Sequence, residues 1–152
     1  MDVEIVQISE DEAEKVLIRC HQIRSEVREI EDFVKSRNGV LEGRLDQRRY
    51  SVPIQDILFI ESVDGRAYLY VKNKVFENDG QLYELESLLK TKQFCRISRS
   101  TIVNLMKIRS IQPALNGRFM LLLETGEKLI ISRSYVKAFK KALKGGKEDE
   151  GA

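Results

Sequence analysis

Two kinds of hydrophobic pattern follow one another in the first third of the chain. Over residues 3–8 and 15–20, apolar residues alternate or form a compact run, which is typical of strands. Over residues 22–36 they recur at three- and four-residue steps with charged residues between them, which predicts an amphipathic helix. Asn38-Gly39 ends this helix, because both residues tolerate the left-handed conformation. Residues 1–45 are therefore predicted to form a small β-β-α extension.

From residue 40 onward, short apolar runs alternate with turn residues, which favours a strand-rich fold. Residues 57–63 and 67–71 flank Asp64-Gly65, a pair that favours a tight hairpin turn because both positions accept positive φ. A second hairpin is predicted around Asn116-Gly117 on the same grounds. Further strands are predicted over residues 41–45, 49–53, 74–77, 108–113, 118–123 and 128–131, whereas residues 101–106 fit a short helix or tight turn.

Two helices are predicted among these strands. The first presents the buried stripe Leu82, Leu85, Leu88 and Leu89, and Asp79 is placed to cap its start. The second covers residues 135–143, with one apolar and one basic face, and Gly145-Gly146 ends it before a flexible tail at residues 145–152. The expected fold class is mainly β (α+β).

Composition adds a strong charge asymmetry to this picture. The 152 residues, 42% of them apolar, suit one globular domain with an extension, and the net charge is only +2. However, residues 1–39 hold 6 basic and 10 acidic residues (−4), whereas residues 94–144 hold 11 basic and 2 acidic (+9). A basic half of this kind points to a polyanion partner. With no apolar run near 18 residues and no leader pattern, a cytoplasmic protein is expected.

The basic part contains a repeated tetrad, Ile-Ser-Arg-Ser, at residues 97–100 and 131–134. Each copy follows an apolar strand and precedes a predicted helix, so Ser100 and Ser134 are expected to cap helices. Arg99 and Arg133 then have their donors free for phosphate or for the acceptor pair on guanine. Two arginines in weak surface ion pairs are the plainer alternative. Arg66 at a hairpin and the basic last helix with Lys137 favour DNA.

Other chemistry finds little support in the sequence. The single histidine, His21, has no carboxylate partner at a recognisable spacing, and Cys20 and Cys95 are isolated thiols expected to act as small apolar residues. No zinc spacing, phosphate loop or nucleophile elbow is present. Residues 10–12 lack the spacing of a calcium loop. No enzyme activity, cofactor, metal or small-molecule substrate is predicted.

Residues 50–143 resemble the LytTR DNA-binding domain of bacterial regulators. The resemblance rests on residues 56–62 (DILFIES), 82–86 (LYELE), 94–105 (FCRISRSTIVNL) and 131–135 (ISRSY). It implies an elongated stack of small antiparallel sheets with short helices, in which loops rather than a recognition helix enter successive major grooves of double-stranded DNA. Residues 46–144 are accordingly assigned to this domain.

By the same resemblance, the expected DNA contacts are Arg66, Ser98, Arg99, Arg133, Ser134 and Lys137. Many members carry histidine where this chain has Ser98, so the base readout departs from theirs. Asn104 is instead expected to hold its own turn.

Residues 1–45 are too few for a receiver domain, so the chain resembles the stand-alone regulators of the family, and it is expected to bind paired repeats as a homodimer. Residues 1–45 would then serve dimerisation or bind a partner, and the resemblance also implies a membrane protein as a partner of the regulator. A protein-interaction or sensory module, using its basic face on an acidic partner or membrane surface, is the alternative.

Overall fold

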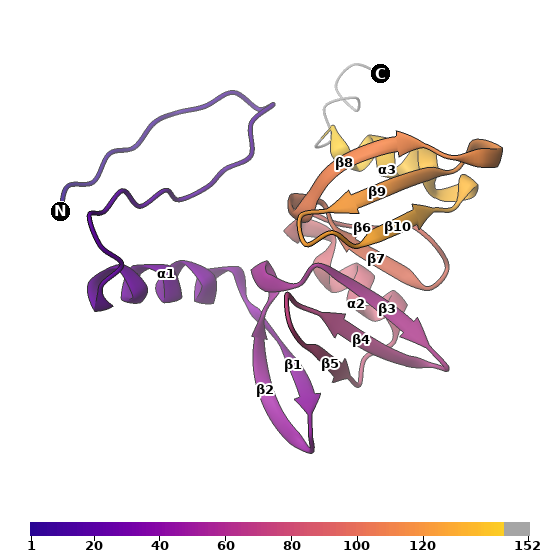
Figure 1. The fold of residues 1–152 in the computed structure, drawn as a ribbon, viewed down its shortest axis with the longest axis horizontal. Helices are drawn as coiled ribbons and strands as arrows, with labels where there is room; N and C mark the ends of the chain where they lie inside the picture. Colours follow the sequence, from indigo (N-terminus) through magenta and orange to yellow (C-terminus); the bar gives the residue numbers. More distant parts are fainter. Residues whose placement is uncertain (145–152) are drawn as a thin grey trace.

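The computed structural model describes residues 1–144 (Figure 1). The strands in this part of the chain are β1 (Val40–Leu45), β2 (Arg48–Pro53), β3 (Phe59–Val63), β4 (Arg66–Tyr70), β5 (Val75–Asn78), β6 (Phe94–Arg96), β7 (Thr101–Asn104), β8 (Ile108–Pro113), β9 (Phe119–Leu123) and β10 (Lys128–Ile131). Seven of them form one sheet in the order β2-β1-β5-β4-β3-β7-β6, and three form a second in the order β10-β9-β8. Every pairing in these sheets is antiparallel. The predicted mainly β architecture is confirmed.

Tight turns fix the register of the hairpins. Asp64 and Gly65 join β3 to β4 with φ of 52° and 79°, so the predicted positive-φ pair is present and Val63 lies opposite Arg66. Asp46 and Gln47 make the same kind of two-residue turn between β1 and β2. The β3–β4 hairpin was predictable because the information lies in two adjacent residues.

Two apolar cores lie on opposite faces of the central strands. Ile60 of β3 and Ile102 of β7 point into one core, and their chain neighbours Phe59 and Val103 point into the other. The first core is closed by the helix α2 (Leu82–Leu89), and the second joins the three-stranded sheet to the helix α3 (Val136–Leu143) through Phe139. The first half of β3 and the whole of β7 are thus buried on both faces, so apolar residues occupy adjacent positions there.

Both predicted helices of the strand-rich part are present, with one change at the start of α2. The residue that caps α2 is Gln81 rather than Asp79, because Gln81 and Glu84 form a reciprocal capping box. Asp79 is instead paired with Arg44. Leu88 is largely exposed, so the buried stripe of α2 consists of Leu82, Leu85 and Leu89.

The N-terminal extension differs from its prediction. The helix is confirmed as α1 (Ser25–Asn38), but residues 3–8 and 15–20 form no strand. A strand needs a neighbour to pair with, and within residues 1–144 neither segment has one. Strand β1 belongs to the seven-stranded sheet, so that sheet begins before residue 46.

A second correction concerns residues 101–106, which were predicted as a helix or tight turn. Residues 101–104 form β7, which is buried between β3 and β6, and only the following residues make a single 3-10 turn, Leu105–Lys107. Pairing with neighbours on both sides outweighs the local pattern. The predicted Gly145-Gly146 stop and the tail at residues 145–152 lie outside the described residues.

Candidate nucleic-acid interface

The two Ile-Ser-Arg-Ser tetrads lie side by side. The first forms the loop between β6 and β7, and the second forms the turn between β10 and α3. The backbone N–H of Ser132 donates to the carbonyl of Ile97 over 2.9 Å, which joins the two tetrads directly. Ile97 and Ile131 are 0% and 1% exposed and belong to the same core. Each tetrad is therefore anchored by its isoleucine, and its Ser-Arg-Ser part stays at the surface.

The serines do not have the predicted capping role. Ser100 precedes the strand β7 rather than a helix. Ser134 lies inside the 3-10 turn Arg133–Tyr135, and neither that turn nor α3 has a side-chain cap. Ser98 is instead the serine with a local structural bond, because its Oγ accepts from the backbone N–H of Ser100 at 3.2 Å. The two copies resemble each other in sequence, but their following elements differ, so their serines sit differently.

Arg96 holds the first loop and was missed by the sequence reasoning. Its Nε donates to the carbonyl of Ser98 at 2.9 Å, one terminal nitrogen donates to the carbonyl of Arg99 at 2.5 Å, and the other pairs with Glu86 of α2 at 2.8 Å. The loop is further tied to β3, because the Ser62 N–H donates to the carbonyl of Ser100 at 2.8 Å. The available signal was a second arginine immediately before the tetrad, on a strand that contacts the preceding helix.

Arg99 and Arg133 are exposed, and no hydrogen bond or ion pair of either side chain is found among residues 1–144. The aliphatic part of Arg133 crosses the backbone of Gly117 so closely that a Cβ there would lie 3.1 Å from Arg133 Cδ. Gly117 also has a φ of +75°, so glycine is needed on two counts. The β8–β9 loop thus supports Arg133, and it brings Arg118, a further exposed arginine absent from the prediction, to the same region.

Arg66 lies at the tip of the β3–β4 hairpin but is not free of acidic neighbours. Its guanidinium is 3.8 Å from Glu77, while its side chain is 67% exposed. Glu77 bonds more closely to Arg44, at 2.6 Å, and Arg44 also pairs with Asp79, whose hydrogen bond is the main cause that raises the pKa of Arg44. Because Glu77 has this nearer partner, Arg66 can leave it for an external anion at small cost.

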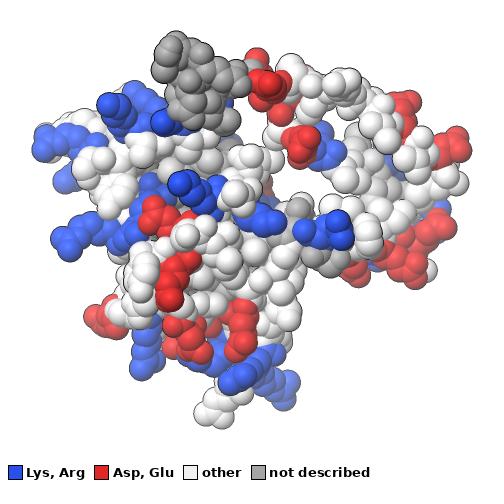
Figure 2. Space-filling model, turned by 180° about the vertical axis from the view of Figure 1, so that it is seen from behind, with Lys and Arg blue, Asp and Glu red and all other residues white. Residues whose placement is uncertain are grey.

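These loops are arranged along one edge of the molecule. In Figure 1 the β3–β4 turn, the β6–β7 loop, the β10–α3 turn and the β8–β9 loop all lie on the right, one above another. Figure 2 shows Lys and Arg side chains gathered at the upper left of the reversed view, over the end that carries the second sheet and α3. Lys137 and Lys140 of α3 are exposed, and the Nζ of Lys140 lies 4.9 Å from the ring centre of Phe119. The loops that carry Arg66, Ser98, Arg99, Arg133 and Ser134 therefore share one edge, and Lys137 follows in the first turn of α3.

Asn104 has the structural role that was predicted for it. It is 3% exposed, its Nδ2 donates to the carbonyl of Ile57 at 2.8 Å, and its Oδ1 accepts from the Met106 N–H at 3.0 Å. The amide therefore ties the end of β7 to the segment before β3.

Within residues 1–144, no group of three or more His, Cys, Asp and Glu side chains could hold a metal ion. None of the helices in the same residues is long and apolar enough to cross a membrane.

The fold is a β-rich domain whose antiparallel sheets carry Arg and Lys side chains on a row of edge loops, an arrangement that can bind nucleic acid. The family model that matches the chain is the LytTr DNA-binding domain, over residues 47–144. The protein belongs to this family.

Relatives and a solved structure agree with the family match. The chain is 35% identical over 98 residues to the "Sensory transduction protein LytT" of Enterococcus faecalis, covering 64% of this chain and 40% of the relative. It is 27% identical over 114 residues to the "Transcriptional regulatory protein LytR" of Staphylococcus aureus, covering 75% and 46%. The chain thus spans less than half the length of these curated relatives. The solved LytTr DNA-binding domain of a putative methyl-accepting/DNA response regulator from Bacillus cereus superposes with a TM-score of 0.66 at 30% identity, covering 69% of this chain and 96% of that one.

Proposed function

We propose that this protein is a transcriptional regulator that binds specific sequences of double-stranded DNA through its edge loops. The observation that carries the proposal is the backbone hydrogen bond from Ser132 to Ile97, which joins the two tetrads that present the exposed Arg99 and Arg133. This matters because loop backbone that is already fixed has less freedom to lose on binding. The names of the two relatives, a sensory transduction protein and a transcriptional regulatory protein, support the same function.

In this proposal, side chains of different length contact different parts of the DNA. Arg99 and Arg133 enter the major groove, where the guanidinium fork matches the O6 and N7 acceptors of guanine. Arg66 and Lys137 bind phosphates on either side and set the register. Ser98 and Ser134 act at short range: the Ser98 Oγ accepts from the Ser100 N–H, and the Ser98 hydroxyl, which lies 3.5 Å from the Ser100 Oγ, can turn to donate to a phosphate or base.

Further parts of the proposal concern the whole protein. We expect it to act in the cytoplasm, to bind paired repeats as a homodimer, and to have no enzymatic activity or small-molecule substrate. A membrane protein is a possible partner by family resemblance.

The test begins with selection of binding sites from a pool of random duplexes, followed by fluorescence anisotropy on an enriched duplex. Arg99→Ala and Arg133→Ala should each weaken binding by about 1–3 kcal/mol, roughly 5- to 150-fold, with an unchanged Tm. Arg109→Ala is the control for the loss of one exposed arginine, because Arg109 lies at the end of β8 away from the β8–β9 loop, where its guanidinium donates to the Glu124 carbonyl at 2.9 Å. Phe94→Ala, in the core at 7% exposure, should instead cost about 3–5 kcal/mol of stability. If Arg99→Ala and Arg133→Ala lowered Tm as much as Phe94→Ala does, the two arginines would have a structural role instead.

Salt dependence gives a second measurement of the same interface. With about six phosphates neutralised, log K should fall with log salt at a slope near −5. The alternative function, a basic face for an acidic protein or anionic membrane, predicts no preference between a selected duplex and its scrambled sequence. That result would overturn the sequence-specific proposal.

A further inference from the structure

The N-terminal segment, residues 1–24, exposes far more apolar surface than its length requires. Eight of its large apolar side chains are exposed: Met1, Val3, Ile5, Val6, Ile8, Val16, Leu17 and Ile23. Val3 and Ile5 are 89% and 91% exposed, and Leu17 is 72% exposed. Contiguous apolar exposure of this kind marks a surface that binds another protein.

The backbone of this segment is also unpaired. Within residues 1–23, and counting partners in residues 1–144, a single backbone hydrogen bond is found, from the Glu12 N–H to the Ser9 carbonyl at 3.2 Å. Residues 3–8 and 15–20 have strand-forming composition, and an extended segment with open N–H and C=O groups can pair with another strand. Figure 1 shows this segment as a wide loop beside α1, with no sheet next to it.

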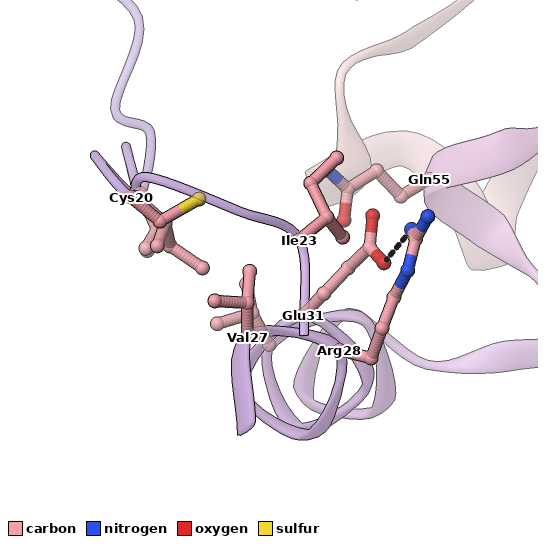
Figure 3. Close-up of a pocket in the computed structure, with 9 residues that line it drawn as sticks. Cys20, Ile23, Val27, Arg28, Glu31 and Gln55 are labelled. Carbon is pink, nitrogen blue, oxygen red and sulfur yellow. Dashed lines mark hydrogen bonds and ion pairs between the residues drawn. The ribbon is translucent and has the colours of Figure 1, made fainter. Parts of the chain in front are cut away.

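A groove runs between the segment and α1. It has a volume of about 300 Å³ and is lined by apolar side chains of both elements, including Val16, Ile18, Ile23 and Val27. Figure 3 shows Cys20 on one side, the helix with Val27 on the other, and the Arg28–Glu31 pair at the far end. Since Arg28 and Glu31 bond to each other at 3.0 Å, the charged residues of the groove neutralise one another.

We propose that residues 1–24 and the adjoining face of α1 bind the same surface of a second copy of this chain. A twofold interface must supply both a groove and the side chains that fill it, and this surface has both: the groove beside α1 and the projecting Val3, Ile5 and Leu17. A fully exposed side chain of this size presents about 100 Å², and the eight residues are 39–91% exposed, so together they present on the order of 500 Å². That is more than half of the roughly 800 Å² that each partner contributes to a stable interface, before α1 or any backbone is counted.

Charge and position argue against the polyanions suggested for the basic edge as occupants of this surface. Residues 1–39 hold 10 acidic and 6 basic residues, so DNA or an anionic membrane would be repelled, whereas apolar side chains beside the paired Arg28 and Glu31 can still pack between two copies. The segment lies on the left of Figure 1 and the edge loops lie on the right, so the dimer leaves both edges open. This inference deepens the homodimer part of the proposed function. It is tested without DNA, so its failure leaves DNA binding itself intact.

Sedimentation of the full chain over a range of concentrations is the direct experiment. The wild type should sediment as a dimer, while Leu17→Glu and Ile23→Glu should weaken the dimer at least 100-fold and sediment as monomers. Leu88→Glu is the matched control, because Leu88 is also an exposed leucine, at 59%, but lies on α2, and this variant should remain a dimer. A monomeric wild type up to high concentration, or equal weakening by Leu88→Glu, would overturn the proposal. In the first case the segment would serve a different partner.

Cys20 offers an independent measurement of the same surface. It is exposed and lines the groove, whereas Cys95 is partly buried with its pKa raised to about 11, so a thiol reagent at neutral pH modifies Cys20 first. Dimerisation should slow this modification at least fivefold as the wild-type concentration rises through the dissociation constant, and Leu17→Glu should abolish the slowing. If the sample sediments as a dimer but the rate of Cys20 modification does not change with protein concentration, the interface lies elsewhere and the proposal is refuted.

Discussion

Replacing Arg96 by alanine would loosen the first tetrad loop without removing any group that the proposed interface uses on DNA. The side chain of Arg96 is only 20% exposed, and its donors are occupied by the Ser98 and Arg99 carbonyls and by Glu86. In the variant these two loop carbonyls lose their partner. We therefore expect Arg96→Ala to weaken DNA binding by raising the cost of ordering the loop.

The magnitude follows from the number of residues that are released. Ser100 stays fixed in the variant, because its carbonyl still accepts from the Ser62 N–H. Ser98 and Arg99 regain freedom, and fixing one residue's backbone costs about 1–2 kcal/mol. The expected loss of affinity is about 2–4 kcal/mol, which is roughly 30- to 700-fold.

The assay is fluorescence anisotropy with a selected duplex, together with a double-mutant cycle. If Arg96 acts by placing Arg99, then Arg96→Ala should lose much less affinity in an Arg99→Ala background than in the wild type. Arg109→Ala serves as the control for the loss of one positive charge. Circular dichroism at the assay temperature checks that each variant is folded. Additive losses in the cycle, or unchanged affinity of Arg96→Ala, would refute the positioning role.

Three further predictions concern stability and reactivity. Asn104→Ala leaves the buried Ile57 carbonyl without a partner, at about 1–3 kcal/mol, and removes the bond to the partly buried Met106 N–H, at about 0.5–1.5 kcal/mol, so urea unfolding should show a loss of about 2–4 kcal/mol, and a loss under 1 kcal/mol would contradict the described bonds. Gly117→Ala should lower Tm, because a left-handed alanine costs about 1–2 kcal/mol of stability, and it should also weaken DNA binding because the new Cβ displaces Arg133. The control is Gly126→Ala, which also has a positive φ but open space around it and should lower Tm without changing DNA binding. Burial, helped by Glu86, raises the pKa of Cys95 from 9.0 to about 11, so its alkylation should quicken with pH up to that value rather than level off near 9. The same shift means that the stability from the buried neutral thiol is complete below pH 9 and is lost as pH rises toward 11, which thermal melts across that range would detect.

The parts of the fold that the sequence predicts well are those decided by adjacent residues. Asp64-Gly65 and Asn116-Gly117 adopt positive φ at both positions, as their composition indicates. The leucine spacing of α2 likewise predicts its buried face, apart from Leu88. In each case the chain needs no distant partner to reach the observed conformation.

The errors occur where a distant partner decides the outcome. Residues 15–20 have a strand pattern but no neighbouring strand within residues 1–144, and they stay extended without pairing. Residues 101–104 lie between β3 and β6, and this pairing makes them a strand although their local pattern fitted a helix or turn. Strand formation depends on cross-strand contacts more than on intrinsic preference, so neither outcome could be read from the segment alone.

The candidate site shows the same division between local pattern and distant contacts. The sequence singles out Arg99 and Arg133, and the structure places both at the surface of one edge; their contact with DNA stays a prediction. Arg96 escaped notice because its role depends on Glu86, ten residues away, and on the path of the loop carbonyls. Residue type and spacing do not report such contacts.

The repetition of Ile-Ser-Arg-Ser has a structural cause that is separate from helix capping. In both copies the isoleucine belongs to one core, and the arginine follows it by two residues, at the point where the chain leaves that core. The bond between Ser132 and Ile97 fixes the spacing of the two copies, so the buried isoleucines determine where the exposed arginines stand. Shortening either isoleucine should therefore disturb both arginines together. Ile131→Val, which keeps the fold and costs about 0.5–1.5 kcal/mol, should lower DNA affinity more than an equally destabilising Ile60→Val in the other core. Equal affinity of these two variants would mean that the tetrads move independently of their shared core.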